Sequence, residues 1–184
     1  AFGACLLEEE VPVFGIRHIK ACDIKSAEEM GRICKMLAFG KKCGESITAY
    51  VEPSFVPKGE LEAAVSTNRN VISFDTELTG KESFYGQGAG RYPTAYNAVA
   101  DCLDIEAGVK NFYTDVMDPL RPDNSREEHP YYVRFKGKCE WLDSVTDKVC
   151  GEGIITKPVS VAAMHAWAQK AASDDAELFF AGLI

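Results

Sequence analysis

The sequence predicts an α+β fold, in which a mixed β-sheet is covered by helices and is followed by a small β-α-(β)-α-β unit. Three observations lead to this prediction. Short β-rich runs bounded by turn residues fill the first half of the chain. An apolar stripe at helical spacing follows them, and a stretch rich in proline and charge separates the two halves.

The first predicted elements lie before residue 57. Residues 23–30 predict a short helix that Gly31 ends, because glycine is favoured just after a helix. Residues 33–39 suit either a continued helix or a strand, and Gly31 favours a strand that ends at the following Gly-Lys-Lys. Residues 46–56 form a β-rich run interrupted by Pro53. Since proline cannot donate to a ladder, this strand is expected at a sheet edge or broken there.

A hairpin and a long helix are predicted next. Strands at residues 70–77 and 82–85 are joined by residues 78–81, Leu-Thr-Gly-Lys, which suit a hairpin. A glycine-rich segment, residues 86–90, then leads into a helix over residues 93–107, which begins with a proline. The apolar positions of this helix fall on one stripe: Ala95, Ala98, Val99, Cys102 and Ile105.

The second half begins with a candidate linker. Residues 118–130 hold three prolines and almost nothing apolar. We therefore divide the chain into residues 1–117, a linker over residues 118–130, and residues 131–184.

The last part is predicted to be a small unit of strands and helices. Residues 131–135 and 177–184 have strand character, and residues 141–150 predict an amphipathic helix. A second helix follows Ser160, whose hydroxyl can cap it, and runs to about Ala172.

Composition and charge exclude several classes of protein. The net charge of −8 and pI near 5.0 argue against a surface for nucleic acid or anionic membranes. No apolar run approaches the roughly 18 residues that span a bilayer. The seven cysteines are scattered without a Cys-x-x-Cys pair, so we expect reduced thiols in a cytoplasmic protein. The three histidines have no ligand-like spacing to any cysteine, and no metal site is expected.

The glycine segment, Gly86-x-Gly88-Ala89-Gly90, lies between a predicted strand and a predicted helix. Glycines let a ligand approach the backbone, and the helix that follows points unpaired N–H groups at it. The spacing G-x-G-x-G differs from the dinucleotide fingerprint G-x-G-x-x-G, and no parallel βαβ continuation ends in an acidic residue about 20 positions on. On these residues alone, a structural strand-to-helix turn and a ligand cradle both remain open.

Three stretches together resemble homoserine dehydrogenases. They are residues 23–37, DIKSAEEMGRICKML, then residues 51–57, VEPSFVP, followed by Asn70-Val71, and residues 85–95, YGQGAGRYPTA. The third is the most specific and continues into the helix with Ala98-Val99 and Asp101. Their order and spacing are kept over roughly residues 1 to 105.

The resemblance implies a fold and an activity. In this family of oxidoreductases a Rossmann domain binds NAD or NADP, and a mixed sheet inserted after it builds the homoserine site and the dimer. Residues 1–117 are then the substrate and dimerisation region. The segment and helix over residues 86–107 are expected to pack on the cofactor domain, with Gly88, Ala89 and Gly90 against the cofactor. The activity implied is interconversion of L-homoserine and L-aspartate 4-semialdehyde, in threonine and methionine biosynthesis.

The resemblance leaves the catalytic residues of this chain unknown. The family's catalytic lysine lies just before an apolar helix whose end resembles residues 1–3, so it is expected upstream of Ala1 and the chain alone is expected to be inactive. Lys35 matches a sheet position and not a catalytic one. Two departures from the family pattern concern detail: Gly59-Glu60 replace a frequent His-Pro pair, and Tyr96-Asn97 replace small residues of the helix.

The part after the linker resembles an abbreviated regulatory ACT module. A purely structural tail and an amino-acid sensor both remain open for it. Met164, His165 and Trp167 are interpreted as packing residues. For the whole chain, the alternative to the enzymatic hypothesis is a non-catalytic amino-acid-binding or regulatory dimerisation module.

Assembly is predicted from the strands. The runs at residues 47–56 and 70–77 are expected to expose backbone donors and acceptors at sheet edges. The family pairs such sheets across a twofold axis, so a symmetric homodimer is expected.

Overall fold

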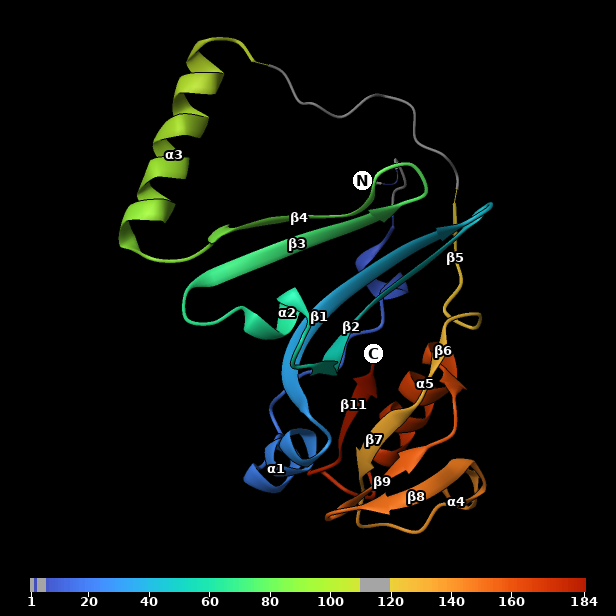
Figure 1. The fold of residues 1–184 in the computed structure, drawn as a ribbon. Helices are drawn as coiled ribbons and strands as arrows, with labels where there is room; N and C mark the ends of the chain where they lie inside the picture. The colour runs from blue at the N-terminus through green and yellow to red at the C-terminus, as the bar shows by residue number, and fades with distance from the viewer. Residues whose placement is uncertain (1, 3–5, 110–119) are drawn as a thin grey trace. The chain divides into compact units, whose positions relative to one another are not determined.

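A computed structural model of the chain describes residue 2, residues 6–109 and residues 120–184. The chain forms two compact units, Ala1–Ala63 with Val116–Ile184, and Ala64–Asp115 (Figure 1). These boundaries differ from the predicted division into residues 1–117, 118–130 and 131–184, and that division stays a prediction. Of the predicted linker, residues 118–119 lie outside the described residues.

A mixed sheet forms the framework of the first unit (Figure 1). Its strand order is β1-β2-β11-β7-β9-β8, with β5 paired to β2. β11 and β5 run parallel to β2, and the other pairs are antiparallel. The predicted α+β class with a mixed sheet is therefore confirmed. The strands are β1 (Arg32–Cys43), β2 (Ser46–Pro57), β5 (Arg121–Pro122), β7 (Tyr131–Arg134), β8 (Thr146–Cys150), β9 (Gly153–Thr156) and β11 (Phe179–Leu183).

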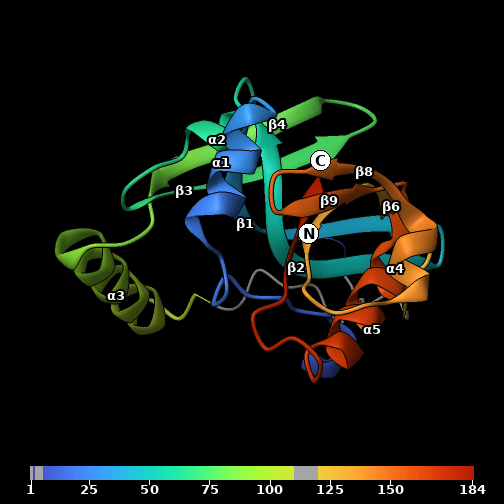
Figure 2. The ribbon, with the colours of Figure 1, turned by 90° about the horizontal axis from the view of Figure 1, so that it is seen from below.

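Helices lie on both sides of this sheet, and Figure 2 shows α1 on one side and α5 on the other. Ser160 caps α5 as predicted, because its hydroxyl accepts a hydrogen bond from the Ala163 N–H. Gly31, at φ +70°, follows the C-cap of α1, also as predicted. The remaining elements of this part are η1 (Glu8–Glu10), α1 (Ala21–Glu29), α2 (Leu61–Ala64), which ends at the unit boundary, β6 (Glu128–His129), α4 (Glu140–Val145), β10 (Val159–Ser160) and α5 (Val161–Ala171).

The core of the first unit is built from adjacent aromatic residues of β7 and β11. Side chains alternate between the two faces of a strand. Tyr131 and Phe180 therefore pack in one cluster with Met164 of α5, whereas Tyr132 and Phe179 pack in another with Ala27 of α1. All four aromatic residues are fully buried. Burial on both faces fixes the register of these two strands.

Two sequence predictions about the sheet were wrong. The strand predicted to end at Gly40-Lys41-Lys42 continues to Cys43 because its whole length pairs with β2. Pro53 neither breaks β2 nor lies at an edge, because β1 pairs with β2 on one side and β11 on the other. Pro53 lies between the bridge of Val51 to Val13 and the β11 pairing, so its missing N–H interrupts neither.

The helix predicted over residues 141–150 was half wrong. α4 ends at Val145, and the rest of the stretch forms β8, which pairs with β9. Gly151 adopts φ +57° in the tight turn between these strands, and a Cβ there would meet the Ser26 hydroxyl at 2.5 Å. The pairing with β9 therefore overrides the helical periodicity, and the C-terminal elements follow the order β7-α4-β8-β9-α5-β11, with the two-residue β10 paired to β6 outside this sheet.

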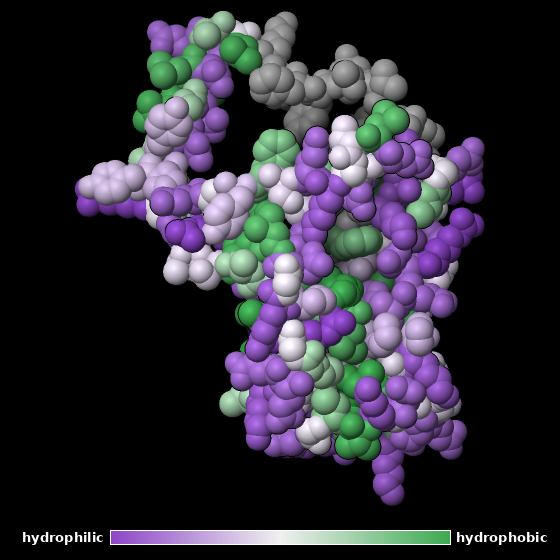
Figure 3. Space-filling view, viewed as in Figure 1, coloured by the Kyte–Doolittle hydropathy of each residue, from purple (hydrophilic) through white to green (hydrophobic). Residues whose placement is uncertain are grey.

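The second unit contains one hairpin and one long helix. β3 (Arg69–Thr76) and β4 (Gly80–Gln87) pair antiparallel, with the turn at Gly80, and α3 spans Arg91–Glu106. These elements match the prediction. No residue of β4 or α3 is buried, and apolar side chains are visible along α3 (Figure 3). Within the described ranges, no helix is long and apolar enough to span a membrane.

Candidate functional site

The glycine segment connects β4 to α3 and is held by one asparagine. The N–H groups of Gly88 and Ala89 donate to the Asn68 carbonyl at 2.9 and 3.2 Å. In return the Asn68 side-chain amide donates to the Ala89 carbonyl at 2.8 Å. These three hydrogen bonds close the segment into a compact loop at the N-terminus of α3. The structure thus brings the predicted residues Gly88, Ala89 and Gly90 together in one loop.

Of the three glycines in this loop, only Gly90 has a backbone conformation that requires glycine. A Cβ on Gly88 would overlap the side-chain amide of Asn70. Gly90 adopts φ +120°, a conformation that other residues rarely take. Gly86 has neither constraint, because a Cβ there would meet nothing within 4 Å. The glycine at position 90 is therefore explained by its backbone conformation without a ligand. At Gly88 only the exposed Asn70 side chain would have to move, and at Gly86 a side chain would meet open space.

The N-terminus of α3 lies beside the loop and is not capped by a side chain. Its N-cap is Gly90, and the first turn carries no acidic residue. The guanidinium of Arg91 lies 5.4 Å from the centre of the Tyr92 ring. Unpaired N–H groups and the helix dipole favour an anion at such an end. Chemically, this end of the loop can accept a phosphate group.

Lys35 lies on β1, opposite Ser54 of β2, in the place expected for a sheet residue. Over the described parts of the chain, no group of three His, Cys, Asp or Glu residues is placed to hold a metal ion.

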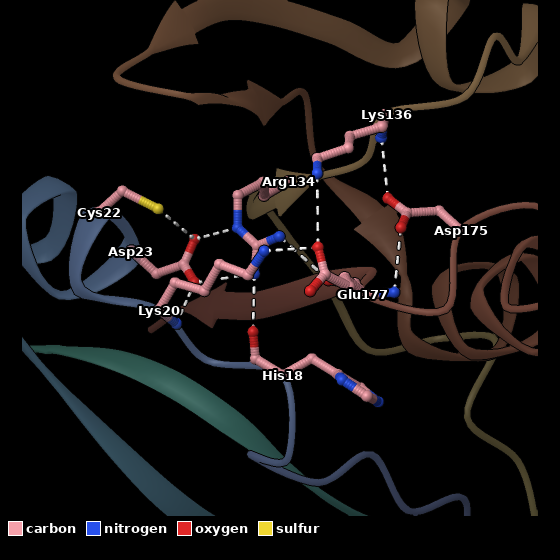
Figure 4. Close-up of polar contacts among 8 residues, drawn as sticks. All are labelled: His18, Lys20, Cys22, Asp23, Arg134, Lys136, Asp175 and Glu177. Carbon is pink, nitrogen blue, oxygen red and sulfur yellow. Dashed lines mark hydrogen bonds and ion pairs between the residues drawn. The ribbon is translucent and has the colours of Figure 1, made fainter.

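A buried ion pair that the sequence analysis missed joins α1 to β7 (Figure 4). Arg134 Nε donates to Asp23 Oδ1 at 2.8 Å, and Nη2 donates to Asp23 Oδ2 at 3.0 Å. The Tyr132 hydroxyl donates to the same carboxylate at 3.0 Å. Asp23 is 0% exposed and Arg134 is 3% exposed. The hydrogen bond to Asp23 raises the pKa of Arg134, so this guanidinium stays charged.

The remaining donors of Arg134 bond to backbone groups on both sides of this pair. Nη2 donates to the His18 carbonyl at 2.7 Å and Nη1 to the Glu177 carbonyl at 3.0 Å. On the surface above, the Glu177 carboxylate accepts from Lys20 at 2.6 Å and from Lys136 at 3.3 Å (Figure 4). These hydrogen bonds and charges lower the pKa of Glu177, with Lys20 contributing most. The whole cluster ties residues before β1 to the C-terminal strands.

A second buried cluster centres on Glu52 of β2. Its Oε1 lies 3.1 Å from His129 Nε2, and its Oε2 lies 2.8 Å from His165 Nε2. Glu52 is fully buried, and a Cβ on Gly182 would meet both Glu52 Oε1 and His129 Nε2 at 2.7 Å. The Tyr131 hydroxyl beside it is buried and has no hydrogen-bond partner in the described structure, and burial raises its pKa.

The sequence analysis missed both clusters because their members are far apart in the chain. Asp23 and Arg134 are 111 residues apart, and Glu52 and His165 are 113 apart. Met164 and Trp167 pack in the core as interpreted, whereas His165 hydrogen-bonds to Glu52. An arginine inside the apolar strand 131–135 was the one available signal, because a buried arginine requires an anion. Neither cluster includes a residue of the glycine loop.

Comparison with known proteins gives one family. The family described as homoserine dehydrogenase matches residues 1–103. A homoserine dehydrogenase from Neisseria gonorrhoeae is 38% identical over 104 residues, which are 56% of this chain and 22% of that protein. One from Lactococcus lactis is 32% identical over 146 residues, which are 78% of this chain and 34% of that protein. The chain thus spans about a third or less of these curated relatives.

Solved structures agree with this result at the level of the fold. A homoserine dehydrogenase from Thiobacillus denitrificans matches with a TM-score of 0.67 at 21% identity, over 100% of this chain and 49% of that chain. One from S. aureus matches with a TM-score of 0.65 at 19% identity, again over 100% and 49%.

Proposed function

The chain belongs to the homoserine dehydrogenase family, and we propose that it is the substrate-side and dimer-forming part of an NAD(P)-dependent enzyme that interconverts L-homoserine and L-aspartate 4-semialdehyde. The family match over residues 1–103 is the observation that carries this proposal, because it includes the glycine loop and the start of α3. The fold of the solved relatives supports it. The enzyme would act in the cytoplasm, in threonine and methionine biosynthesis.

The glycine loop is the proposed cofactor contact of this chain. Gly88, Ala89 and Gly90 would face NAD or NADP, whose nicotinamide ring accepts or donates the hydride when bound. The loop fits such a group in two respects: the Ala89 side chain is exposed, and the uncapped N-terminus of α3 suits the charge of a pyrophosphate. The role of these residues is to hold and orient the cofactor through backbone groups.

The catalytic lysine is proposed to lie in a part of the enzyme that precedes residue 1. Lys35 is a sheet residue, and the relatives extend far beyond the matched region. The expected consequence is that the isolated chain does not oxidise homoserine.

The second unit is the proposed dimer contact. β3 and β4 form a two-stranded sheet of their own, and Ile72, Phe74 and Phe84 on it are exposed. The other strand proposed for this role, β2, is internal to its sheet, so the prediction that it lies at an edge was wrong. An exposed apolar hairpin favours pairing with a second copy. A monomer at high concentration in light scattering would count against this assignment.

The C-terminal part is proposed to be ACT-like. Apart from the two-residue β10, its elements follow the order β-α-β-β-α-β along the chain, and its strands lie in the order β11-β7-β9-β8 in the sheet, which supports this assignment. It shares one sheet with β1 and β2, so it is joined to the substrate-side region through β11.

The decisive experiment uses the whole enzyme that carries this sequence. Homoserine-dependent reduction of NADP⁺ or NAD⁺ is followed by the absorbance of the reduced nicotinamide, and cofactor affinity is measured by calorimetry. The whole enzyme should turn over, and the isolated chain should not. Turnover by the isolated chain would overturn the placement of the lysine. Absence of turnover in the whole enzyme, with correct folding, would instead support the non-catalytic dimerisation module.

A further inference from the structure

A strained turn in the second unit, residues 66–69, immediately precedes β3. The turn is closed by the Arg69 N–H, which donates to the Ser66 carbonyl at 3.3 Å. Thr67 has φ +62°, and among the residues that the structure describes it is the one non-glycine residue with a positive φ. A β-branched residue in this conformation is strained, because turns of this kind favour glycine, asparagine or aspartate. Such strain persists only where the surrounding structure holds it, and it gathers at functional sites.

Asn68, the residue after Thr67, bonds to the glycine loop through both its backbone and its side chain. Its carbonyl accepts from the N–H groups of Gly88 and Ala89, and its side-chain amide donates to the Ala89 carbonyl at 2.8 Å. The same amide nitrogen would lie 3.4 Å from a Cβ on Gly90. One residue of the strained turn therefore lies against all three residues proposed to contact the cofactor.

A second asparagine, Asn70, lies against the same loop from the start of β3. It is paired with Gly86 in the β3–β4 register, and a Cβ on Gly88 would overlap its side-chain amide. Arg69 contacts the Tyr85 ring instead, with its guanidinium 5.8 Å from the ring centre, because neighbouring strand residues point to opposite faces. Two amide side chains therefore border the loop, and only that of Asn68 is hydrogen-bonded to it among the described residues.

The conformation of the glycine loop depends on Asn68 because burial does not hold it. Gly88, Ala89 and Gly90 are all exposed in this chain. Over the described ranges, the hydrogen bonds of Gly88 and Ala89 go to Asn68 alone. A segment with few buried contacts opens readily when a hydrogen bond is removed. Loss of the Asn68 amide should therefore release the loop while the hairpin beside it stays paired.

We propose that Asn68 is a positioning residue for the nicotinamide cofactor. It fixes the glycine loop, before the cofactor arrives, in the conformation that meets NAD or NADP. The strained backbone of Thr67 presents both the carbonyl and the amide of Asn68 to the loop. A loop that is already ordered loses less freedom on binding, so the cofactor binds more tightly. This inference rests on the proposed cofactor contact of the loop, and its tests separate the two.

The first test follows the loop in this chain without cofactor. Asn68→Ala removes the side-chain hydrogen bond to the Ala89 carbonyl and keeps the backbone carbonyl of residue 68. Hydrogen exchange of the Gly88 and Ala89 amides should become roughly three- to tenfold faster, which is the effect of one lost hydrogen bond. The control is Thr76→Ala at the other end of the hairpin, where Thr76 Oγ1 accepts from the Thr79 N–H at 3.1 Å. It should leave exchange of the two loop amides unchanged.

The second test measures cofactor binding and kinetics in the whole enzyme. In Asn68→Ala the Kd and KM of NADP⁺ or NAD⁺ should rise roughly three- to tenfold, because only part of the loops then has the binding conformation. The KM for homoserine at saturating cofactor should not change, which separates positioning of the cofactor from general damage to the fold. Thr67→Gly keeps the turn, since glycine adopts a positive φ freely, and it should leave cofactor affinity within about twofold.

Several outcomes would overturn the role of Asn68. They are unchanged exchange of the loop amides in Asn68→Ala, an equal loss of cofactor affinity in Thr76→Ala or Thr67→Gly, and an equal rise in the KM for homoserine. Unchanged cofactor affinity in Asn68→Ala would also overturn it, and Ala89→Leu then shows which idea has failed. If Ala89→Leu lowers the affinity, the loop contacts the cofactor without positioning by Asn68. If neither variant lowers it, the proposed cofactor contact itself is wrong.

Discussion

The two compact units of this chain differ in what determines their local conformation. In the first unit, charged and aromatic side chains are buried against each other, as Asp23 is against Arg134. In the second unit, no residue of β4 or α3 is buried. The loop between them is held by hydrogen bonds to the backbone and side chain of Asn68, and it requires the positive φ of Gly90. Substitutions should therefore act through lost partners in the first unit and through the backbone in the second.

The largest effect is expected at the buried ion pair of the first unit. Arg134→Met leaves the Asp23 carboxylate in the interior without its cation, and it removes donors to the His18 and Glu177 carbonyls. We expect the free energy of unfolding to fall by roughly 3–5 kcal/mol. Urea denaturation followed by circular dichroism measures this change.

A matched control lies on the same helix as Asp23. Lys25 and Glu29 form an exposed i,i+4 pair at 3.8 Å, and Lys25→Gln should cost less than about 0.5 kcal/mol. If Arg134→Met and Lys25→Gln lowered the free energy of unfolding equally, burial would not determine how much a charged side chain contributes to the stability of this unit.

The second-largest effect is expected in the glycine loop. Gly90→Val forces a branched side chain into φ +120°, and it should destabilise the second unit by about 1–3 kcal/mol whether or not a cofactor binds. Hydrogen exchange of the β3, β4 and α3 amides measures this loss within the unit. Retained protection would show that the loop tolerates another backbone conformation. A loss of cofactor affinity at Gly90 therefore cannot by itself establish a cofactor contact.

A substitution at Ala89 tests the cofactor contact without the backbone strain that a substitution at Gly90 also causes. It is exposed in the described structure, and φ at Ala89 is not positive, so Ala89→Leu adds volume without backbone strain. If the loop contacts the cofactor, affinity in the whole enzyme should fall about tenfold, roughly 1.4 kcal/mol. The melting temperature without cofactor should not change. Unchanged affinity would remove Ala89 from the proposed cofactor contact and leave the loop a structural turn.

How far the sequence predicts this fold depends on the distance between interacting residues. The β3–β4 turn at Gly80 and the Ser160 cap of α5 are set within a few residues, and both were predicted. The strand β8 was missed because it forms by pairing with β9, and the periodicity of its own residues does not reveal that pairing. The glycine loop was located from its motif, but the φ of Gly90 and the contact of Gly88 with Asn70 were visible only in the structure.

The smallest effect is expected at the surface of the first unit, above the buried pair. Lys20 and Lys136 lower the pKa of Glu177 below its ordinary value of 4.5, which is the usual direction for a carboxylate with cationic partners. A lowered folded-state pKa contributes stability that is fully present above the unfolded value and is lost as pH falls through the folded value. Glu177→Gln should therefore lower the melting temperature slightly at neutral pH. The difference from the unchanged chain should shrink as pH falls below about 4.5.

Salt distinguishes this surface effect from that of the buried pair below it. The backbone carbonyl of Glu177 still accepts from Arg134 in Glu177→Gln, so the buried pair is kept while the surface charges lose their partner. Because Glu177 and its lysines are exposed, added salt should screen the Glu177→Gln effect. The loss in Arg134→Met should persist in salt, since water and ions do not reach Asp23. If the change in melting temperature caused by Glu177→Gln did not depend on salt or pH, the Glu177 side chain would stabilise the fold as part of the buried cluster and not through its surface charges.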